Sequence, residues 1–203
     1  GHPRFGGNNS NVQTELKQGS VGYIVSTDYA FTAVMNDKRS IVTWGGANML
    51  GTPISLNDSI RKQVSMYGIY KIHSTSSAFV AILENGDLVT WGDVHHGGLI
   101  PATQEAQLQV GVEYIVSNYG AFVAKLSKRN GVVAWGDSDC GGTMSIEMQQ
   151  EIKTKGVDHI YATKAAFAVT LLDGSAKTWG SRIYGGNSDN IRETLIRGYS
   201  TRI

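Results

Sequence analysis

A few residues of this 203-residue chain have types and spacings that suit metal binding. Asp93, His95 and His96 combine a carboxylate with two imidazoles, which are common ligands of metal ions. Adjacent histidines on a tight loop cannot easily turn to one ion, however. Asp137 and Asp139 resemble the opening of a calcium loop, but the residues that follow supply no further carboxylate. We therefore expect no metal and no cofactor, and we interpret these polar residues as parts of solvent-exposed loops.

The single cysteine, Cys140, is the one candidate for a reactive nucleophile. A nucleophilic cysteine needs a nearby histidine and a group that orients that histidine, and the sequence indicates neither. The paired glycines of the chain are not followed by Lys-Ser or Lys-Thr, so they are turns and not phosphate-binding loops. We therefore interpret Cys140 as a small packed thiol, and we predict that the chain is not an enzyme and has no catalytic residues.

The overall composition limits the classes of function further. Eighteen basic and 17 acidic residues give a formal net charge of +1, without the basic footprint of a nucleic-acid-binding protein. No apolar run approaches the roughly 18 residues that would span a bilayer. A single cysteine excludes an internal disulfide and leaves the redox compartment open. We expect no nucleic acid as partner and no membrane insertion.

One sequence unit occurs four times along the chain. In each copy an Ala-Phe pair stands twelve or thirteen residues before a Trp-Gly pair, and the tryptophans are 47, 44 and 44 residues apart. A glycine pair follows at six and seven residues after the tryptophan in three copies, whereas the first copy has Leu50-Gly51 there. The Trp-Gly pairs are Trp44-Gly45, Trp91-Gly92, Trp135-Gly136 and Trp179-Gly180, and the glycine pairs are Gly97-Gly98, Gly141-Gly142 and Gly185-Gly186.

The copies define the domain organisation. We divide the chain into units of residues 1–45, 46–92, 93–136 and 137–180, followed by a partial unit, 181–203, and we expect one repeat-array domain. Gly1–Gly7 matches Gly92–Gly98, so the chain starts at the residue that elsewhere follows the tryptophan. We therefore expect a fragment of a longer array.

Each unit is predicted to begin with a short amphipathic helix, because apolar residues recur there at i and i+4. Ser10 with Gln13, and Asn190 with Glu193, have the spacing of capping boxes. The expected helices cover residues 11–18, 59–66, 146–153 and 190–197, and the expected C-terminal stops are Gly19, Gly68, Gly111, Gly156 and Gly198.

Three strands are predicted to follow each helix. In the second copy they cover residues 69–74, 78–83 and 88–91, and Asn85-Gly86 between the last two is a strong hairpin signal. The Ser-Thr pairs, such as Ser74-Thr75, are expected to cap the bend between the first two strands. The fold class is therefore a β-rich (α+β) repeat. About four units of a short helix plus three antiparallel strands stack as a propeller-like or solenoid array around the repeated Phe and Trp side chains.

The repeated order resembles the RCC1-type β-propeller repeat. The resemblance is carried in the second copy by Ala78–Ile82, Asn85-Gly86, Val89–Gly92 and Gly97-Gly98. Two features depart from that family: alanine stands where it usually has histidine, and Gly-Gly stands where it has Gly-Gln-Leu-Gly. RCC1-type blades also close with a strand where we expect a helix. The likeness implies protein binding.

The sequence is more similar to a divergent version of this repeat than to the RCC1-type repeat itself. That divergent version resembles repeats of large bacterial surface proteins, including intimin/invasin-like adhesins. Its best copies here are Ile160–Thr163, Ala166–Val169 and Ile183–Gly186. This resemblance covers nearly the whole chain. It implies attachment or spacing on a cell surface.

These observations favour a non-enzymatic binding or adhesion module of a cell-surface or secreted protein. We expect it to recognise a protein or glycan ligand on another cell through loops that differ between copies, and self-association of the repeats is a further expectation. The alternative is an intracellular, cytoplasmic RCC1-like interaction platform that acts on a small GTPase or a chromatin regulator. The candidate ligand-binding residues in the variable loops are Asn48, Asp93, His95, His96, Asp137, Asp139, Arg182 and Tyr184.

Overall fold

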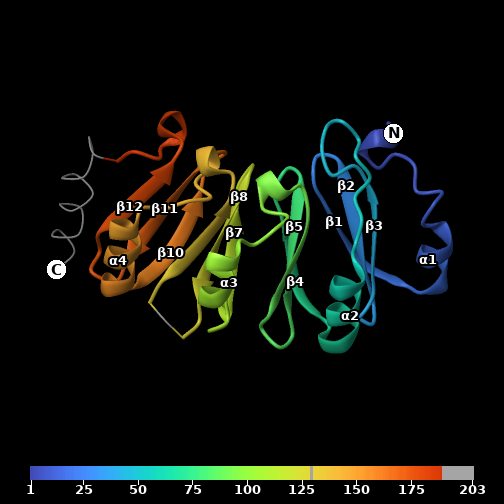
Figure 1. Cartoon of the computed structure of the whole chain (residues 1–203), viewed down its shortest axis with the longest axis horizontal. Coiled ribbons are helices and arrows are strands. Elements are labelled where there is room, and N and C mark those ends of the chain that lie inside the picture. Colours follow the sequence, from blue (N-terminus) through green and yellow to red (C-terminus); the bar gives the residue numbers. More distant parts are fainter. Residues whose placement is uncertain (129, 189–203) are drawn as a thin grey trace. The chain divides into compact units, whose positions relative to one another are not determined.

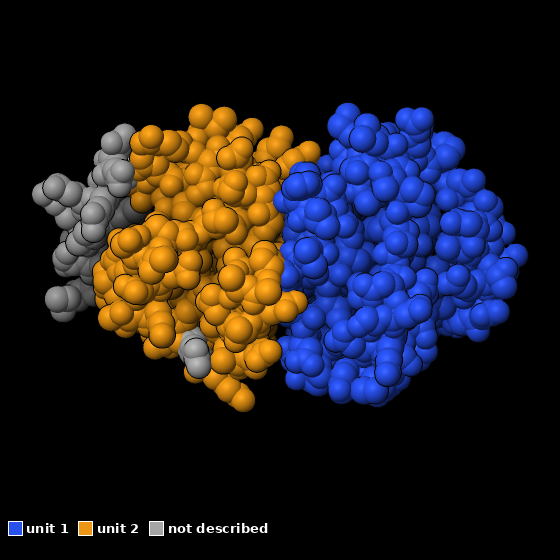
Figure 2. All heavy atoms as spheres, viewed as in Figure 1, with its two compact units in different colours: residues 1–100 blue, residues 101–203 orange. Residues whose placement is uncertain are grey.

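The computed structural model describes residues 1–128 and 130–188 (Figure 1). The chain divides into two compact units, Gly1–Ile100 and the part from Pro101 onward (Figure 2). We call them the first half and the second half. Each half contains two of the three-stranded sheets, and the sheets of repeats 1 to 4 follow the chain in order.

Every repeat contains an antiparallel sheet in which the first strand pairs with the second and the second with the third. The register shifts once near the start of each first strand, as between Val21 and Tyr23. The strands are β1 (Val21–Ser26), β2 (Ala30–Met35) and β3 (Ile41–Gly45); β4 (Ile69–Ser74), β5 (Ala78–Leu83) and β6 (Leu88–Gly92); β7 (Val112–Ser117), β8 (Ala121–Leu126) and β9 (Val132–Gly136); and β10 (Val157–Ala162), β11 (Ala166–Leu171) and β12 (Ala176–Gly180).

A short helix precedes each sheet. A single 3-10 turn precedes the first, third and fourth helices, and a fourth 3-10 turn follows the last sheet. The helices are α1 (Gln13–Gln18), α2 (Asp58–Tyr67), α3 (Ala102–Leu108) and α4 (Ile146–Lys155), and the 3-10 turns are η1 (Pro3–Phe5), η2 (Val94–His96), η3 (Ser138–Cys140) and η4 (Arg182–Tyr184). The predicted fold class, four units of a short helix plus three antiparallel strands, is therefore confirmed. The helix predicted at 190–197, with its Asn190 capping box and Gly198 stop, lies outside the described residues.

The ends of the helices differ from prediction in two places. Ser10 does not cap α1: the helix begins after Val12, whose side chain cannot accept a hydrogen bond. Gly111 does not end α3, because that helix ends at Leu108 and its C-cap is Gln109. Gly68 and Gly156 do end α2 and α4, with φ of +77° and +78°, a region in which a Cβ would be strained.

A stacked Phe–Trp pair bridges the second and third strands of each sheet, one residue pair from the end of the ladder. The phenylalanine of the second strand is directly opposite the tryptophan of the third, and the ring centroids are 5.4 Å apart in the pair Phe79–Trp91 and 5.6 Å apart in Phe167–Trp179. All four of these rings are at least 95% buried. The prediction that the repeated aromatic residues form the core is confirmed, and such contacts contribute about 0.5–1.5 kcal/mol beyond burial of area.

The helix of the later repeat fills the wedge between two sheets in each half. In the first half, Ile60 and Val64 of α2 pack in one cluster with residues of both β2–β3 and β5–β6. In the second half, Ile152 of α4 occupies the same place between β8–β9 and β11–β12. A helix of two to three turns is not stable alone, so this burial between sheets is what holds it.

Candidate functional site

The two ends of each sheet carry different connections. The bend between the first and second strands meets the segment after the third strand, and the backbone N–H groups of Asp93, Asp137 and Ser181 donate to carbonyls of that bend at 2.9 Å. The hairpin turns between the second and third strands lie at the opposite end (Figure 1). We call these the loop end and the hairpin end of a repeat. All eight residues predicted to bind a ligand lie in segments of the loop end.

The carboxylates of Asp93 and Asp137 form the 3-10 turns of the loop end. Asp93 Oδ1 accepts a hydrogen bond from the N–H of His95, and Asp137 Oδ1 accepts one from the N–H of Asp139, each at 2.9 Å. Asn48 does the same in the first copy, where its Oδ1 accepts from the N–H of Leu50 at 3.1 Å. These three predicted residues therefore shape the backbone of the loops, as Asx turns do.

The 3-10 turns are tied to the strand bend by a side chain at one repeated position. Thr75 Oγ1 donates to the carbonyl of His96 at 3.0 Å, and Thr163 Oγ1 donates to that of Tyr184 at 2.7 Å. Thr75 Oγ1 also accepts from the N–H of Ala78, so the predicted capping of the bend is confirmed. In the third repeat Asn118 replaces the threonine, and its Nδ2 donates to the carbonyl of Cys140 at 2.7 Å. Sequence reasoning missed Asn118, although its place in the alignment with Thr75 is the signal.

Asp93 and His96 form a pair within their own loop. His96 Nδ1 lies 3.1 Å from Asp93 Oδ1. Burial raises the pKa of Asp93, but the hydrogen bonds from His96 and from the N–H of His95 outweigh it and hold that pKa below its ordinary value. Among the residues that the structure describes, no three His, Cys, Asp or Glu side chains gather in a group that could hold a metal ion.

Cys140 is buried, so the prediction of a packed thiol is confirmed. Its Sγ lies 3.7 Å from Asp137 Oδ2. Burial, followed by the negative charge of Asp137, raises the pKa of the Cys140 thiol to about 11. The sulfur is therefore protonated near neutral pH, whereas a nucleophilic cysteine needs its thiolate.

The side chains that point into solvent at the loop end differ from repeat to repeat. His95, Asp139, Arg182 and Tyr184 of the predicted set are exposed. Apolar residues that sequence reasoning missed are also exposed in these segments. These are Met49, Leu50, Val94, Leu99 and Ile183, of which Ile183 is 86% exposed. Met49, Val94 and Ile183 follow the residue that opens the turn, Leu50 takes the place of the first glycine of the pair, and Leu99 directly follows the pair.

Two exposed aromatic groups add to the loop ends. In the first half, the rings of His2, Phe5 and Tyr29 form a row with centroid distances of 5.0 and 5.5 Å. In the second half, Lys164 Nζ lies 5.5 Å from the centroid of Tyr119. The two loop ends therefore present different chemistry on the same framework.

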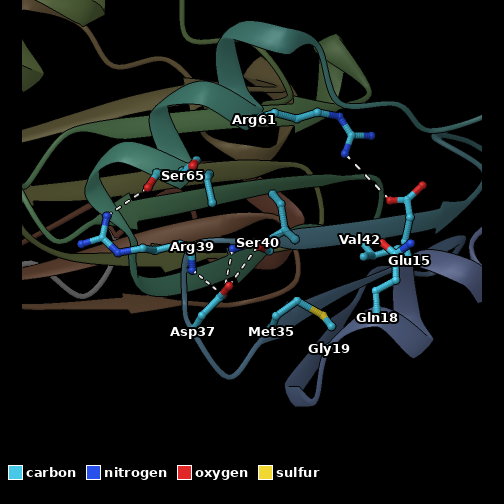
Figure 3. Close-up of a pocket in the computed structure, with 12 residues that line it drawn as sticks. Glu15, Gln18, Gly19, Met35, Asp37, Arg39, Ser40, Val42, Arg61 and Ser65 are labelled. Atoms are coloured by element: carbon cyan, nitrogen blue, oxygen red, sulfur yellow. Dashed lines mark hydrogen bonds and ion pairs between the residues drawn. The ribbon is translucent and has the colours of Figure 1, made fainter.

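A pocket of about 370 Å³ lies in the first half between α1, α2 and the β2–β3 hairpin (Figure 3). Its charged side chains hold these elements together. Arg39 donates to the carbonyls of Ser65 and Met66 at 2.9 and 2.6 Å, and Arg61 lies 4.0 Å from Glu15. We therefore interpret this pocket as a gap left where repeats 1 and 2 pack together. We place the candidate functional site at the loop end.

No described helix has the length and the apolar character needed to cross a lipid bilayer.

No protein-family model matches the sequence, and no curated protein matches it. Three solved structures are similar in fold. The CRINKLY WD40 ectodomain of the Arabidopsis thaliana receptor kinase ACR4 has a TM-score of 0.50 at 16% identity, over 80% of this chain and 50% of that one. The ectodomain of the Physcomitrella patens receptor kinase CR4 has a TM-score of 0.51 at 14% identity, over 80% and 39%. Yeast RCC1 (Prp20), in its structure bound to Kap60, has a TM-score of 0.52 at 16% identity, over 85% and 44%.

This chain thus spans half or less of the structures it resembles. Identities of 14 to 16% relate the chains by fold alone. The four repeats, each a short helix and three antiparallel strands, match the blades of RCC1-like β-propellers.

Proposed function

We propose that this chain is a non-enzymatic binding module that recognises a protein or glycan ligand through the loop ends of its repeats. The observation that carries the proposal is the contrast between a repeated framework and unlike exposed side chains. Thr75 and Thr163 anchor their 3-10 turns by the same hydrogen bond, yet Val94-His95 is exposed on one turn and Arg182-Ile183 on the other. A fixed scaffold with variable loops is the usual design of a recognition surface.

A setting outside the cell is part of the proposal. Two of the similar structures are ectodomains of receptor kinases, and the repeat resembles those of bacterial surface adhesins. Because hydrogen bonds hold these loops in place, little conformational entropy is lost when a ligand binds, and this favours affinity. We propose that the chain attaches a secreted or cell-surface protein to a ligand on another cell.

The absence of catalysis is also a proposal, and the chemistry of the loops supports it. The thiol of Cys140 is buried with its pKa raised to about 11, and the carboxylates of Asp93 and Asp137 are engaged by backbone N–H groups. These groups shape the turns and are poorly placed to act as nucleophile or general base.

The experiment is a binding screen of the chain against a glycan array and against intact cells. The variant Arg182→Ala/Ile183→Ala removes two exposed side chains from the loop end and should weaken binding at least about tenfold, as loss of a central contact does. Asn85→Ala/Leu172→Ala removes exposed side chains at the hairpin ends and is the matched control. Equal losses in the two variants, or binding that neither variant alters, would place recognition elsewhere.

An intracellular interaction platform is the second candidate, and the fold of yeast RCC1, seen bound to Kap60, favours it. It predicts binding to a small GTPase or to nucleosomes in the absence of any glycan. Titration of the chain with each of these separates the two functions, because a ligand on another cell would leave both titrations flat.

A further inference from the structure

The first strand of a later repeat is covered by the sheet before it. Ile72 in β4 is 6% exposed and packs in one cluster with Ala30, Val34 and Ile41 of repeat 1. Ile160 in β10 is 7% exposed and packs with Ala121 and Val123 of repeat 3. In both halves, small or β-branched residues of one sheet thus cover the central isoleucine of the next.

Repeat 1 has the same residue at this position, but nothing described covers it. Ile24 is 53% exposed, and it pairs with Ala33 as Ile72 pairs with Ala81. Val21 is 39% exposed, whereas its equivalents Ile69 and Val157 are 0% and 4% exposed. We call Val21 and Ile24, which pair with Met35 and Ala33 and lie on the same side of the sheet, the open face of repeat 1.

Repeat 1 does contain the helix and the aromatic pair that line the same packing surface in repeat 2. Val12 directly precedes α1, and Leu16 lies within it. Both pack in one cluster with Trp44, just as Ile60 and Val64 of α2 pack in one cluster with Trp91. The wedge helix and the aromatic core are therefore present in repeat 1. Within residues 1–128 and 130–188, what repeat 1 lacks is a second sheet against its first strand, and the packing between repeats 1 and 2 shows which kind of residues would cover the open face.

Repeat 4 carries the complementary positions. Register and alignment place Ala168, Thr170, Ala176 and Thr178 where repeat 1 has Thr32, Val34, Ile41 and Thr43. All four are half-buried, and a hollow of about 310 Å³ lies beside them, lined by Met148, Ala176 and Thr178 among others. We call these four residues the far face of repeat 4.

We propose that the open face of repeat 1 binds the far face of repeat 4 of a second copy of this chain. The contact would reproduce the packing between repeats 1 and 2 and between repeats 3 and 4. Because the two faces differ, the association is heterologous and continues from copy to copy until a ring closes or a filament forms. Burial of Ile24 and Val21 is the main driving force, since both are apolar side chains now in water.

The test is the molar mass of the whole chain in solution, measured by sedimentation equilibrium over a range of concentrations. The chain should form species that grow with concentration. Ile24→Arg should weaken the association about a hundredfold or more, because it would bury an unpaired charge in the contact. Met66→Arg places the same charge on a residue of α2 that is likewise 53% exposed, and it should associate like the parent chain.

A mixing experiment tests the direction of the contact. Ile24→Arg blocks the open face and Ala176→Arg blocks the far face, so each variant should be monomeric alone. Together they should form a 1:1 dimer that grows no further, because each copy still has one working face. Circular dichroism confirms that both variants are folded, and Ala168→Arg replaces Ala176→Arg if the latter unfolds.

Three results would overturn the proposal. The parent chain could stay monomeric at every concentration. Ile24→Arg could associate as well as the parent. Folded Ala176→Arg could still self-associate alone, which would mean that two open faces meet each other.

Discussion

The two halves solve the same packing problem in different ways at the segment that leads from a sheet to the next helix. We call residues 46–57 the first junction and residues 137–145 the second junction. In the second junction the Gly141-Gly142 pair turns the chain, and the carbonyl of Gly141 accepts from Trp179 Nε1 at 2.9 Å. The first junction is longer by three residues, as the wider spacing of its tryptophans indicates.

The longer first junction loses that hydrogen bond and gains apolar burial. Trp91 Nε1 is buried and finds no acceptor among the described residues. Ile54 and Leu56 of the first junction, 8% and 7% exposed, join the core cluster of Trp91 instead. An unsatisfied buried donor costs about 1–3 kcal/mol, and burial of two large aliphatic side chains offsets it at about 1.5–3 kcal/mol each.

The largest expected effect concerns the part that the halves share. Phe79→Ala and Phe167→Ala each remove a ring that is at most 1% exposed and stacked on a tryptophan. Each should lower the free energy of unfolding by about 3–5 kcal/mol, measured by urea denaturation. Phe5→Ala, at a ring 42% exposed, is the control and should cost far less. A large loss in only one half would mean that the shared core is not equivalent.

The second glycine of the pair in the second junction packs against backbone and leaves no room for a side chain. A Cβ on Gly142 would collide with the backbone of Gly136, which no side-chain rotation relieves. Gly142→Ala should therefore destabilise the chain by about 1–3 kcal/mol in the same urea experiment. At Gly131 the nearest atom to an added Cβ is Leu126 Cδ1 at 3.9 Å, so Gly131→Ala is the matched control. Leu50→Ala, at the place that Gly141 has in the second junction, should be nearly neutral because Leu50 is 77% exposed.

The tryptophan hydrogen bond gives a smaller and more specific difference. Trp179→Phe removes the donor to Gly141, whereas Trp91→Phe removes a donor that has no acceptor among the described residues. Both lose similar apolar area, so Trp179→Phe should cost about 1 kcal/mol more. Thermal unfolding of the two variants side by side measures the difference. Equal costs would show that the hydrogen bond to Gly141 adds nothing to stability.

The smallest expected effect is the acid sensitivity of the hairpin end in repeat 4. Hydrogen bonds from Ser175, followed by Lys155, lower the pKa of Asp173 to about 2. A lowered pKa means that this stabilisation is complete above the ordinary value of 3.8 and is lost as the pH falls toward 2. The stability difference between the parent and Asp173→Asn should therefore shrink between about pH 4 and pH 2. Leu172→Ala, a neutral change at the neighbouring exposed residue, should show no such trend.

Sequence periodicity predicted the elements well because their causes are local. The first two predicted strands of repeat 2 have the same bounds as β4 and β5. The observed β6 is one residue longer than the third predicted strand. Gly86, in the Asn-Gly turn, has φ of +87°, a conformation that glycine adopts without strain. In repeat 1 the looser turn lacks glycine, and Lys38 takes φ of +57° while Asp37 accepts from the N–H groups of Arg39 and Ser40.

The sequence predicted positions for the candidate residues but not the roles of their side chains. The rule that function lies where the copies differ placed all eight residues at the loop end. It could not separate Asp93, Asp137 and Asn48, which bond to their own backbone, from His95 and Arg182, which face solvent. Side-chain direction depends on which backbone N–H groups the turn leaves free, and a sequence pattern carries no such geometry. Ser10 failed as a cap for the same reason.

The sequence by itself determined the repeat, its four copies, the order helix–strand–hairpin and the aromatic core, since these follow from spacing and short-range turn chemistry. Only the tertiary structure decided which isoleucines are covered. Ile24, Ile72 and Ile160 stand at the same place in their repeats, yet one is half in water and two are buried. Burial is a property of what packs against a side chain, and for the first strand of each repeat that is another sheet.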